Sequence, residues 1–389
     1  MKTRELSPHA DARESRKQRR DSGQVQILIC GAYGQGNAGD EAVLDALLQE
    51  IRKTGVPAEV TVLSKNCRET ERRADVTAVH SFFIPGVLRA MRKADVVLQG
   101  GGNLLQNQTS TRSLLYYLSF LEQAHRMGKQ TWLIGCGFGP FQNRLAKRQA
   151  FRTLRRCAAG GSIRDPDSLR QALENGLCPE RFLLSSDLTF ALAAPPAESR
   201  CGAVQGNTLG IVPCGNRMTP AWESALADLA RKRYRERGTQ PVLLCLQRRE
   251  DAGAAARIEK RIQDIPHTVI IIPPSGDTFR NIFADLSETV SFRLHGLLFS
   301  VSGSIPCAAL GTDPKLAAFA ADAGGAVPTV AEPSADAMAE ALDYAAGRKR
   351  ALDAAREKLV QRQKGNSDLL RIALTAADFP NKTSSGSIV

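Results

Sequence analysis

The chain has 389 residues, of which 43% are hydrophobic and 5% aromatic, and it carries a net charge of +12 at pH 7. This length is sufficient for two α/β domains of ordinary size, and the scarcity of aromatic residues argues against a stacking platform for single-stranded nucleic acid. No apolar stretch is long enough to span a membrane, and the charged N-terminus lacks the apolar segment of a signal peptide.

Residues 1–24 carry seven Lys or Arg residues against four acidic residues and are expected to form a disordered basic tail. Further positive charge is spread along segments such as 144–156 and 231–237. Solvated helix faces account for such charge most simply, and attraction to an anionic phospholipid surface or to a polyanionic substrate is the alternative. The sequence contains no nucleic-acid-binding motif, so nucleic acid is not an expected partner.

From Val25 onward, short apolar runs alternate with segments of helical pattern. The expected strands are Val25–Cys30, Glu59–Leu63, Val96–Gln99, Thr131–Gly135, Gly161–Ile163 and Leu183–Ser185. The expected helices are Glu41–Lys53, Pro85–Lys93, Ser113–Met127, Arg144–Cys157 and Pro166–Asn175. Strands and helices that alternate through short loops are typical of a parallel, doubly wound sheet.

Residues 191–207 have the composition of a linker, and a second alternating set follows them. Its expected strands are Leu209–Val212, Val242–Leu246, Thr268–Ile272, Thr289–Phe292, Cys307–Leu310 and Ala326–Thr329. Its expected helices are Pro220–Glu236, Ala252–Asp264, Gly296–Ser302, Pro314–Asp322 and a long segment after Ser334. The sequence therefore predicts two Rossmann-like domains, over 25–195 and 205–379, that face a cleft. The C-terminal helix is expected to pack back on the first domain, and 380–389 to be a frayed tail.

The nine cysteines are scattered, with no C-x-x-C pair and no Cys/His cluster at metal-ligand spacing. Several lie inside apolar strands, where cysteine acts as a small hydrophobic residue. This usage predicts no metal site and a reducing, cytoplasmic location.

A glycine-rich loop, Gly31–Glu41, follows the first expected strand and opens a helix. Its glycines satisfy G-x-G-x-x-G, but three residues separate them from the strand, and the second strand runs into Ser64 and Lys65 rather than an acidic ribose ligand. A dinucleotide is therefore disfavoured. Asn37 and Asp40 suit either sugar hydroxyls or a fixed loop with helix capping.

Two further strands of the first half end in glycine. Gly100, Gly101 and Gly102 precede Asn103, and the next strand ends in Gly137-Phe138-Gly139-Pro140. Three consecutive glycines cost chain entropy, so they form either a plain tight turn or a close approach of the backbone to a ligand. Because the carboxyl ends of parallel strands meet at one edge, the convergence favours a ligand that lies across this edge.

Basic residues mark the ends of other strands. Arg164 pairs with Asp165 or binds an anion in the cleft. Arg293, Leu294 and His295 lie where a strand turns into a helix, so backbone N–H groups there favour an anion. Arg293 offers bidentate binding of phosphate or carboxylate, and His295 suits a general acid near neutral pH. Lys315 is either a second anion contact or a surface lysine.

The chain resembles polysaccharide pyruvyl transferases over about residues 25–345. The segments that carry the resemblance, in this order, are Gly31–Ala42, Gly100–Gln106, Gly137–Pro140, Arg164–Ser168, Arg293–His295 and Asp313–Lys315. Within the family, the chain is most similar to the bacterial branch that modifies secondary cell-wall polymers for S-layer anchoring. One departure is Asn107, where that branch usually has Asp after Leu-Leu-Gln, and this puts the identity of the acceptor sugar in doubt.

The resemblance implies a GT-B-like fold, phosphoenolpyruvate as donor, no cofactor, and a 4,6-pyruvate ketal on a hexose such as N-acetylmannosamine as product. Donor contacts would fall on Arg164, Arg293, the Leu294 backbone, His295 and Lys315. Acceptor contacts would fall in the loops that contain Asn37, Asp40, Gly101, Gly102 and Asn103. The acceptor would be a glycan or a lipid-linked glycan at the inner face of the membrane.

Two other classes of function stay open. A GT-B glycosyltransferase would use the Arg and Lys residues to hold the diphosphate of a nucleotide-sugar, although no Glu follows Asp313-Pro314-Lys315 in the next helical turn to bind a ribose. A protein that binds an anion or a glycan without catalysis is the third class.

Overall fold

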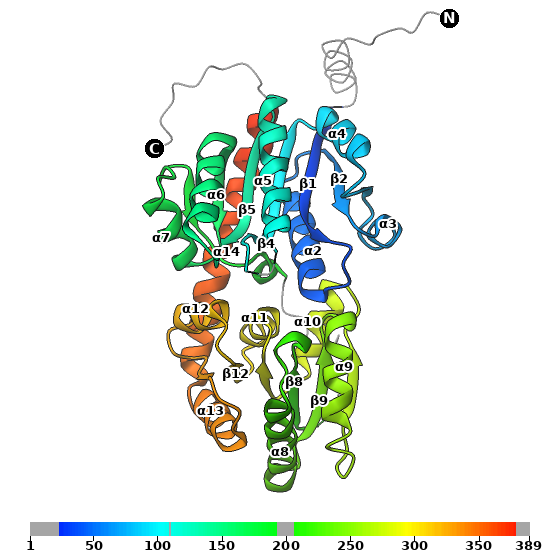
Figure 1. Ribbon diagram of the computed structural model, residues 1–389, viewed down its shortest axis with the longest axis vertical. Coiled ribbons are helices and arrows are strands. Elements are labelled where there is room, and N and C mark those ends of the chain that lie inside the picture. The colour runs from blue at the N-terminus through cyan, green and yellow to red at the C-terminus, as the bar shows by residue number, and fades with distance from the viewer. Residues whose placement is uncertain (1–22, 109, 193–205, 379–389) are drawn as a thin grey trace, which may run out of the picture. The chain divides into compact units, whose positions relative to one another are not determined.

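The computed structural model describes residues 23–108, 110–192 and 206–378, which form two compact units (Figure 1). Unit 1 contains residues up to Gln35, Leu47–Ser186 and the chain from Lys364 onward. Unit 2 contains Gly36–Ala46 and Asp187–Gln363. The units thus differ from the expected segments 25–195 and 205–379 in three places: Gly36–Ala46 and the residues from Asp187 belong to unit 2, and the residues from Lys364 belong to unit 1. The proposed basic tail, the C-terminal tail and most of the linker lie outside the described residues.

Among the described residues, unit 1 has one sheet of seven parallel strands in the order β3-β2-β1-β4-β5-β6-β7. The strands are β1 (Val25–Tyr33), β2 (Ala58–Ser64), β3 (Thr77–His80), β4 (Val96–Leu105), β5 (Gln130–Phe138), β6 (Ala158–Ile163) and β7 (Phe182–Leu184). The sequence analysis missed β3, a four-residue edge strand without an apolar run. The order reverses between β1 and β4, and a doubly wound sheet builds its site at such a switch point.

Some of the strand-end glycines lie inside their strands, which corrects the predicted strand ends, whereas Gly34 and Gly139 follow β1 and β5. β4 continues through Gly100–Gly102 to Leu105, and β1 and β5 likewise include Gly31 and Gly137. The register shifts after Cys30, after Gly102 and after Leu133, so these strand ends are irregular. Bulges of this kind re-aim the backbone at a sheet edge.

The described part of unit 2 has a sheet of six parallel strands in the order β10-β9-β8-β11-β12-β13, with its switch point between β8 and β11. The strands are β8 (Thr208–Val212), β9 (Gln240–Cys245), β10 (Thr268–Ile271), β11 (Glu288–Ser291), β12 (Cys307–Leu310) and β13 (Thr329–Val330). The last expected strand was placed too early, since only its final residue, Thr329, is in a strand.

Helices cover both faces of each sheet. Those of unit 1 are α3 (Cys67–Ala74), α4 (Ile84–Lys93), α5 (Thr111–Arg126), α6 (Arg144–Cys157) and α7 (Pro166–Glu174), together with the last part of α2 (Ala38–Lys53) from Leu47 onward. Those of unit 2 are α8 (Pro220–Arg237), α9 (Arg248–Glu259), α10 (Gly276–Ala284), α11 (Leu294–Ser302), α12 (Pro314–Asp322) and α13 (Ala335–Gly347), with the short helices η1 (Leu188–Ala191) and η3 (Gly215–Arg217). The sequence analysis missed α3, which is mostly polar, and α10, for which it expected no helix.

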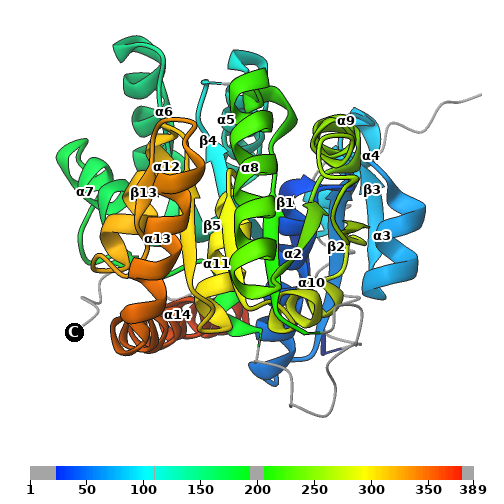
Figure 2. The ribbon, with the colours of Figure 1, turned by 90° about the horizontal axis from the view of Figure 1, so that it is seen from below.

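Two apolar cores hold the six-stranded sheet, one on each face. Figure 2 shows α8 between α9 and α13, and these helices pack Leu226, Ile258 and Met338 against one face. On the other face, α11 and α12 bury Leu298 and Leu316 together with the first part of α14 (Lys349–Asp378). The last part of α14 belongs to unit 1, where Asn366 donates to the Ser186 carbonyl over 3.0 Å.

Among the described residues, no helix combines the length and the apolar character that crossing a bilayer requires.

Candidate functional site

The candidate donor residues gather at the carboxyl edge of the sheet of unit 2. η3 follows β8, α9 follows β9, α11 follows β11, and α12 follows β12, so four neighbouring strands each deliver a loop to this edge. The switch point between β8 and β11 lies in the middle of this set. In an open α/β sheet, ligands bind in the crevice at this position.

Arg293 is the N-cap residue of α11, and residues around the start of α9 hold its guanidinium. Its Nε and Nη2 donate to Asp251 Oδ1 over 3.1 and 2.5 Å, and Nη2 also donates to Glu250 Oε2 over 2.9 Å. Nη1 donates to Gln247 Oε1 over a longer 3.5 Å. A guanidinium has five N–H donors. Within the part of the chain that the structure describes, these bonds leave one N–H of Nη1 without an acceptor.

The two acids that hold Arg293 differ in exposure. Asp251 is fully buried and also accepts the Gln247 backbone N–H, whereas the Glu250 side chain is 42% exposed. Burial by itself lowers the pKa of the Arg293 guanidinium, but Asp251 and Glu250 raise that pKa above its ordinary value. Arg293 is therefore a permanent cation, anchored by Asp251 and contacted by a carboxylate that a ligand could displace.

A second cation lies beside this pair. Arg217, the last residue of η3, donates from Nη1 to the Phe292 carbonyl over 3.1 Å and forms an ion pair with Asp313. The loop before it approaches α9 so closely that a Cβ at Gly215 would be 1.7 Å from the Glu250 carbonyl oxygen, so only glycine fits there. Lys315 is half-buried in the first turn of α12, where its backbone N–H caps onto Asp313.

His295 lies in the first turn of α11, and its ring packs against the backbone of Gly39. A Cβ at Gly39 would be 2.1 Å from His295 Nδ1. This explains the last glycine of the G-x-G-x-x-G pattern by the packing of an imidazole. Gly39 also donates its N–H to Asn37 Oδ1 over 3.1 Å, so the Asn37 side chain caps the start of α2.

The loop of Asn37 is tied to the same network. Asn37 pairs with Gln247 in an isolated antiparallel bridge, and Ala38 donates its N–H to the Leu246 carbonyl over 2.9 Å. Because Gln247 also contacts Arg293, the loop after β9 connects the Asn37 segment to the guanidinium. Residues 37, 39, 247, 293 and 295 therefore form one continuous site within unit 2. Asp40 follows this loop and is half-buried in the first turn of α2.

The corresponding edge of unit 1 is lined by glycine and amide groups. Gly101 and Gly102 have φ values of +57° and +77°, a region that L-residues with side chains avoid. Asn103 donates from Nδ2 to the Gly139 carbonyl, which joins the ends of β4 and β5. Its Oδ1 is buried and, among the described residues, accepts no hydrogen bond. This oxygen points to a ligand hydroxyl or water, since buried polar atoms are normally paired.

Arg164 lies at the end of β6, with its backbone N–H bonded to the Cys136 carbonyl over 3.0 Å. Its side chain is 8% exposed and lies against Gly137, where a Cβ would be 2.9 Å from Nε. Asp165 is 3.8 Å from Nε, but its carboxylate mainly caps α7 through the N–H and hydroxyl of Ser168. The contact between Asp165 and the Arg164 guanidinium is thus weak. The structure is compatible with both interpretations of the sequence, an ion pair with Asp165 and binding of an anion.

Asn107, the residue that departs from the expected Asp, is buried and used internally. Its Oδ1 accepts the Gln142 N–H over 2.7 Å, and its Nδ2 is 3.5 Å from the Thr111 hydroxyl. An Asp at this position would keep the first bond and lose the second donor. Asn107 therefore orders the loop after β5.

Sequence reasoning missed the residues that hold Arg293, namely Gln247, Glu250, Asp251 and Gly215, and also Arg217. It began the helix after β9 at Ala252, whereas α9 begins at Arg248, so both acids of the first turn were assigned to a loop. Acidic residues directly after an apolar strand were the available signal, since strand ends carry the site in this kind of sheet.

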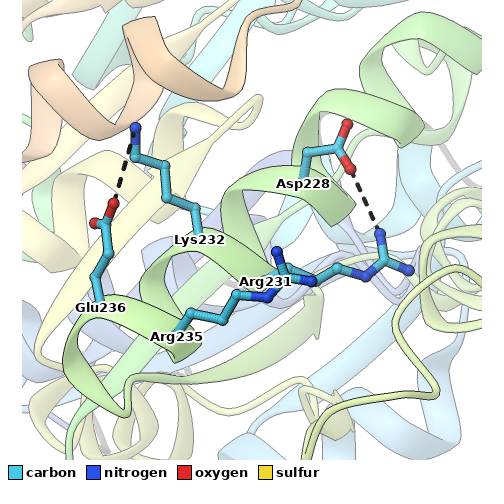
Figure 3. A pocket seen from close by; sticks show the side chains of 5 residues that line it. All are labelled: Asp228, Arg231, Lys232, Arg235 and Glu236. Carbon is cyan, nitrogen blue, oxygen red and sulfur yellow. Dashed lines mark hydrogen bonds and ion pairs between the residues drawn. The ribbon is translucent and has the colours of Figure 1, made fainter.

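A separate hollow of about 550 Å³ lies on α8 and is lined by Asp228, Arg231, Lys232, Arg235 and Glu236 (Figure 3). Several of these side chains form ion pairs with other residues of the same chain. Arg231 bonds to Asp264 over 2.9 Å and Lys232 to Asp336 over 2.5 Å. The hollow is thus a charged helix surface that lies apart from the four strand-end loops.

The segment from Asn37 to Pro314 matches the family model described as polysaccharide pyruvyl transferase. This range covers most of the chain, including the Asn37 loop, both sheet edges and the Arg293–His295 pair. The chain belongs to the polysaccharide pyruvyl transferase family. It is therefore an enzyme of the family that transfers pyruvyl groups to polysaccharides. No curated protein matches the sequence.

Solved structures similar to this transferase show its fold. A putative UDP-N-acetylglucosamine 2-epimerase from Listeria monocytogenes is 12% identical, with a TM-score of 0.63, over 94% of this chain and 100% of its own. The Neisseria meningitidis UDP-GlcNAc 2-epimerase bound to UDP-GlcNAc has the same identity and TM-score, over 90% and 99%. The S. aureus MnaA–UDP co-structure is 10% identical, with a TM-score of 0.66, over 94% and 100%. These matches confirm the predicted α/β, GT-B-like fold class.

Metal ligands do not cluster in the described part of this transferase: it contains no group of three or more His, Cys, Asp or Glu side chains that could hold a metal ion. None of its eight described cysteines forms a disulfide, and burial raises the pKa of the Cys214 thiol beside Arg293.

Proposed function

We propose that this transferase moves the pyruvyl group of phosphoenolpyruvate onto a hexose, such as N-acetylmannosamine, of a cell-wall polysaccharide or its lipid-linked precursor, and forms a 4,6-ketal. The observation that carries the proposal is the pair Arg293 and His295 at the switch point of unit 2, in a chain of this family. A fixed cation and a titratable imidazole in adjacent positions suit a small polyanion that must be held and protonated.

Donor binding would use the groups that the network leaves accessible. The remaining N–H of Arg293 Nη1 would hold an oxygen of the phosphoenolpyruvate carboxylate or phosphate, and the donor would displace Glu250, the more exposed of the two acids. The backbone N–H of Leu294 belongs to the first turn of α11, whose N–H groups have no acceptor within the helix. Lys315 would supply further positive charge at the edge of unit 2, and Arg164 is the proposed anion contact at the edge of unit 1.

The chemistry begins with protonation of the methylene carbon of phosphoenolpyruvate, for which His295 is the proposed acid. Protonation makes C2 electrophilic, one sugar hydroxyl adds to C2 and loses its proton, and the C2–O bond to phosphate breaks. The second hydroxyl then adds to C2, loses its proton to the departing phosphate and closes the ketal. Inorganic phosphate leaves, and the cations that held the donor stabilise its charge.

Acceptor binding would use neutral groups. Asn103 Oδ1 and the backbone at Gly101 and Gly102 would accept or donate hydrogen bonds to sugar hydroxyls, because they are polar, close to the switch point of unit 1 and uncharged. Asn37 and Asp40 are the proposed contacts from the loop before α2, although Asn37 Oδ1 already caps the helix.

A phosphate-release assay tests the proposal. The purified enzyme is incubated with phosphoenolpyruvate and a panel of lipid-linked and soluble hexosides, and the product is examined for a mass gain equal to a pyruvyl ketal. Phosphate release that depends on the acceptor is the expected result. UDP-N-acetylglucosamine in place of phosphoenolpyruvate tests the glycosyltransferase alternative, and UDP release from it would overturn the proposal.

The role of His295 needs its own test. His295→Ala is expected to lower kcat by about 10²- to 10⁴-fold, the range in which general acids contribute. His125→Ala, at an exposed position of α5, is the matched control and should leave kcat unchanged. Near wild-type turnover of His295→Ala would remove His295 from the reaction.

The location of the enzyme and its branch of the family are proposed on the same basis. A lipid-linked acceptor places the enzyme in the cytoplasm at the inner face of the membrane, and the S-layer branch would make the product an anchor for a surface layer. Loss of pyruvate from the cell-wall polymer on deletion of the gene checks this assignment.

A further inference from the structure

Three consecutive large apolar side chains are exposed at the carboxyl edge of unit 1. Phe82, Phe83 and Ile84 are 57%, 58% and 56% exposed, and they follow β3 directly and begin α4. Single apolar residues on a surface are ordinary. The packing of unit 1 does not explain why three in succession are exposed at the start of a helix. A contiguous exposed apolar patch marks an interaction site.

Hydrogen bonds and ring contacts hold the Phe82–Ile84 turn in place. The Phe83 N–H donates to the His80 carbonyl over 2.9 Å. The Phe82 ring meets the Tyr116 ring edge-on at 5.5 Å, and the Tyr116 hydroxyl donates to the Ser81 carbonyl over 3.1 Å. The rings are therefore presented on a rigid support, which limits the conformational entropy that binding must remove.

Positive charge lies next to the turn at Lys65 and continues along α4. Lys65 Nζ lies 5.5 Å from the centre of the Phe82 ring, and the exposed face of α4 carries Arg89, Arg92 and Lys93. The helix contains no acidic residue, and in the described residues none of its three cations forms an ion pair. Val87 and Met91 face the core, and the three cations are exposed on the turns of α4 that follow Ile84.

We propose that the surface formed by Phe82–Ile84, Lys65 and the outward face of α4 binds an anionic phospholipid bilayer. Aromatic and branched apolar side chains next to Lys and Arg are the combination that holds a protein at a membrane interface, since the apolar groups enter the acyl boundary and the cations contact lipid phosphates. β3 ends at the same sheet edge as the glycine-lined ends of β1, β4 and β5. The contact therefore brings that edge to the membrane, where a lipid-linked acceptor presents its sugar.

Vesicle flotation with the full-length protein tests the bilayer contact without any turnover. The wild type is expected to float with vesicles that contain phosphatidylglycerol and to remain below with vesicles of phosphatidylcholine alone, and added salt should weaken the binding. Phe83→Ser/Ile84→Ser removes apolar surface and should weaken binding at least about 10-fold. Leu145→Ser, at an apolar residue 77% exposed on α6, is the control and should bind as the wild type does.

A second pair of variants tests the charges. Arg89→Gln/Arg92→Gln/Lys93→Gln should weaken vesicle binding about 100-fold, since each cation near an anionic surface adds a similar amount to the free energy of binding. Arg144→Gln/Lys147→Gln/Arg148→Gln removes the same charge from α6, which lacks the apolar turn, and should have a much smaller effect. Equal losses from the two triple variants would overturn the proposal, because they would show attraction to net charge alone.

Other occupants of the surface give different results. If Phe83→Ser/Ile84→Ser converts a dimer into a monomer by analytical ultracentrifugation and leaves vesicle binding unchanged, the surface joins two copies of the chain and the proposal fails. The same double variant is repeated in a chain that lacks residues 2–22. If the double variant binds vesicles more weakly than its unsubstituted parent in the shortened chain as well, the binding is assigned to the α4 surface. If it binds as its parent does in both the full-length and the shortened chain, the proposal is overturned. Phosphate release with a soluble acceptor should be unchanged in every variant, so failure of the proposed reaction and failure of the bilayer contact are separate outcomes.

Discussion

The two sheets of this transferase share one topology but have different chemistry at their carboxyl edges. In both, the strand order reverses beside the first strand of the unit, β1 or β8. The edge of unit 1 is built from glycines with positive φ and from amide side chains such as Asn103, with Arg164 as its cation. The edge of unit 2 is built from charged side chains, in which Arg293 pairs with Asp251 and Arg217 pairs with Asp313.

This difference suggests a division of work between neutral and charged recognition. Amide and backbone groups suit sugar hydroxyls, which need hydrogen bonds of fixed direction but no charge. The unit 2 network suits a small anion, but its acids balance its arginines, so an anion must replace Glu250 to bind strongly. In the proposed reaction, specificity for the donor would arise from exchange of one carboxylate for another, at a cation whose position Asp251 holds.

The largest expected effect follows from removing the cation of unit 2. Arg293→Ala should lower kcat/KM for phosphoenolpyruvate by about 10³-fold, since a buried, charge-assisted contact is lost. It also leaves Asp251 buried without its partner, which should lower the free energy of unfolding by about 3–5 kcal/mol. Steady-state kinetics and chemical denaturation measure the two effects.

The double variant Arg293→Ala/Asp251→Asn separates binding from folding. Replacing the buried carboxylate by an amide should restore most of the stability but none of the activity. Recovery of activity together with stability would show that Arg293 is structural, and that the comparison between a charged donor edge and a neutral acceptor edge is wrong.

The next effect concerns the packing of His295. Gly39→Ala puts a methyl group where the imidazole lies, at 2.1 Å from Nδ1, so the ring must move. A displacement of about 1 Å can lower a rate by about 100-fold, and a fall of this size in kcat is expected, with little change in KM for the acceptor. The control is Gly253→Ala in α9, where the nearest side-chain atom, Arg257 Nη1, is 3.6 Å away and no clash occurs. A normal kcat for Gly39→Ala would show that the position of His295 does not limit the reaction.

A smaller effect tests the neutral edge. Asn103→Ala removes the bond to the Gly139 carbonyl and the buried Oδ1, so KM for the acceptor should rise about 10-fold, as for the loss of one neutral hydrogen bond of about 1–1.5 kcal/mol. KM for phosphoenolpyruvate should not change, which is the opposite pattern to Arg293→Ala. If the donor KM rises instead, the assignment of unit 1 to the acceptor is contradicted.

Much of this architecture could be predicted from local sequence patterns. The apolar runs and glycine ends located most of the strands, and the Arg293–His295 segment was placed correctly at the end of β11. β3 was missed because Thr77–His80 has no apolar run, and the paired acids were missed because α9 begins at Arg248, before its apolar pattern starts.

The contacts that build the site could not be predicted in this way. Arg293 and Asp251 are separated by 42 positions, and Gly39 and His295 by most of the described chain. Nothing in either segment alone specifies its partner, since the contact depends on the order of strands in the sheet. Glycine spacing matched a dinucleotide-binding pattern that the sequence analysis disfavoured, but it gave no indication that Gly39 is needed for the packing of a ring.

The smallest expected effect is a different response of the two units to acid. In unit 2, hydrogen bonds from Arg231 lower the pKa of Asp264, and Arg233 and Arg237 lower that of Asp343 against the opposing effect of burial. Such carboxylates stabilise the folded state above their unfolded pKa of about 4, and the stability is lost as pH falls through the lower folded pKa. Burial raises the pKa of Glu288, whose contribution has the opposite sign and reduces the net effect.

The chain has two tryptophans, and each reports on one unit. Trp132 lies in β5 of unit 1 and Trp222 in α8 of unit 2. Fluorescence during acid titration of Trp132→Phe should show the transition of unit 2, and that of Trp222→Phe the transition of unit 1. Unit 2 is expected to unfold at the higher pH, by a fraction of a pH unit. Substituting Asp343→Asn should remove part of the difference, because an amide cannot titrate, whereas an unchanged difference would show that these ion pairs do not set the acid stability of unit 2.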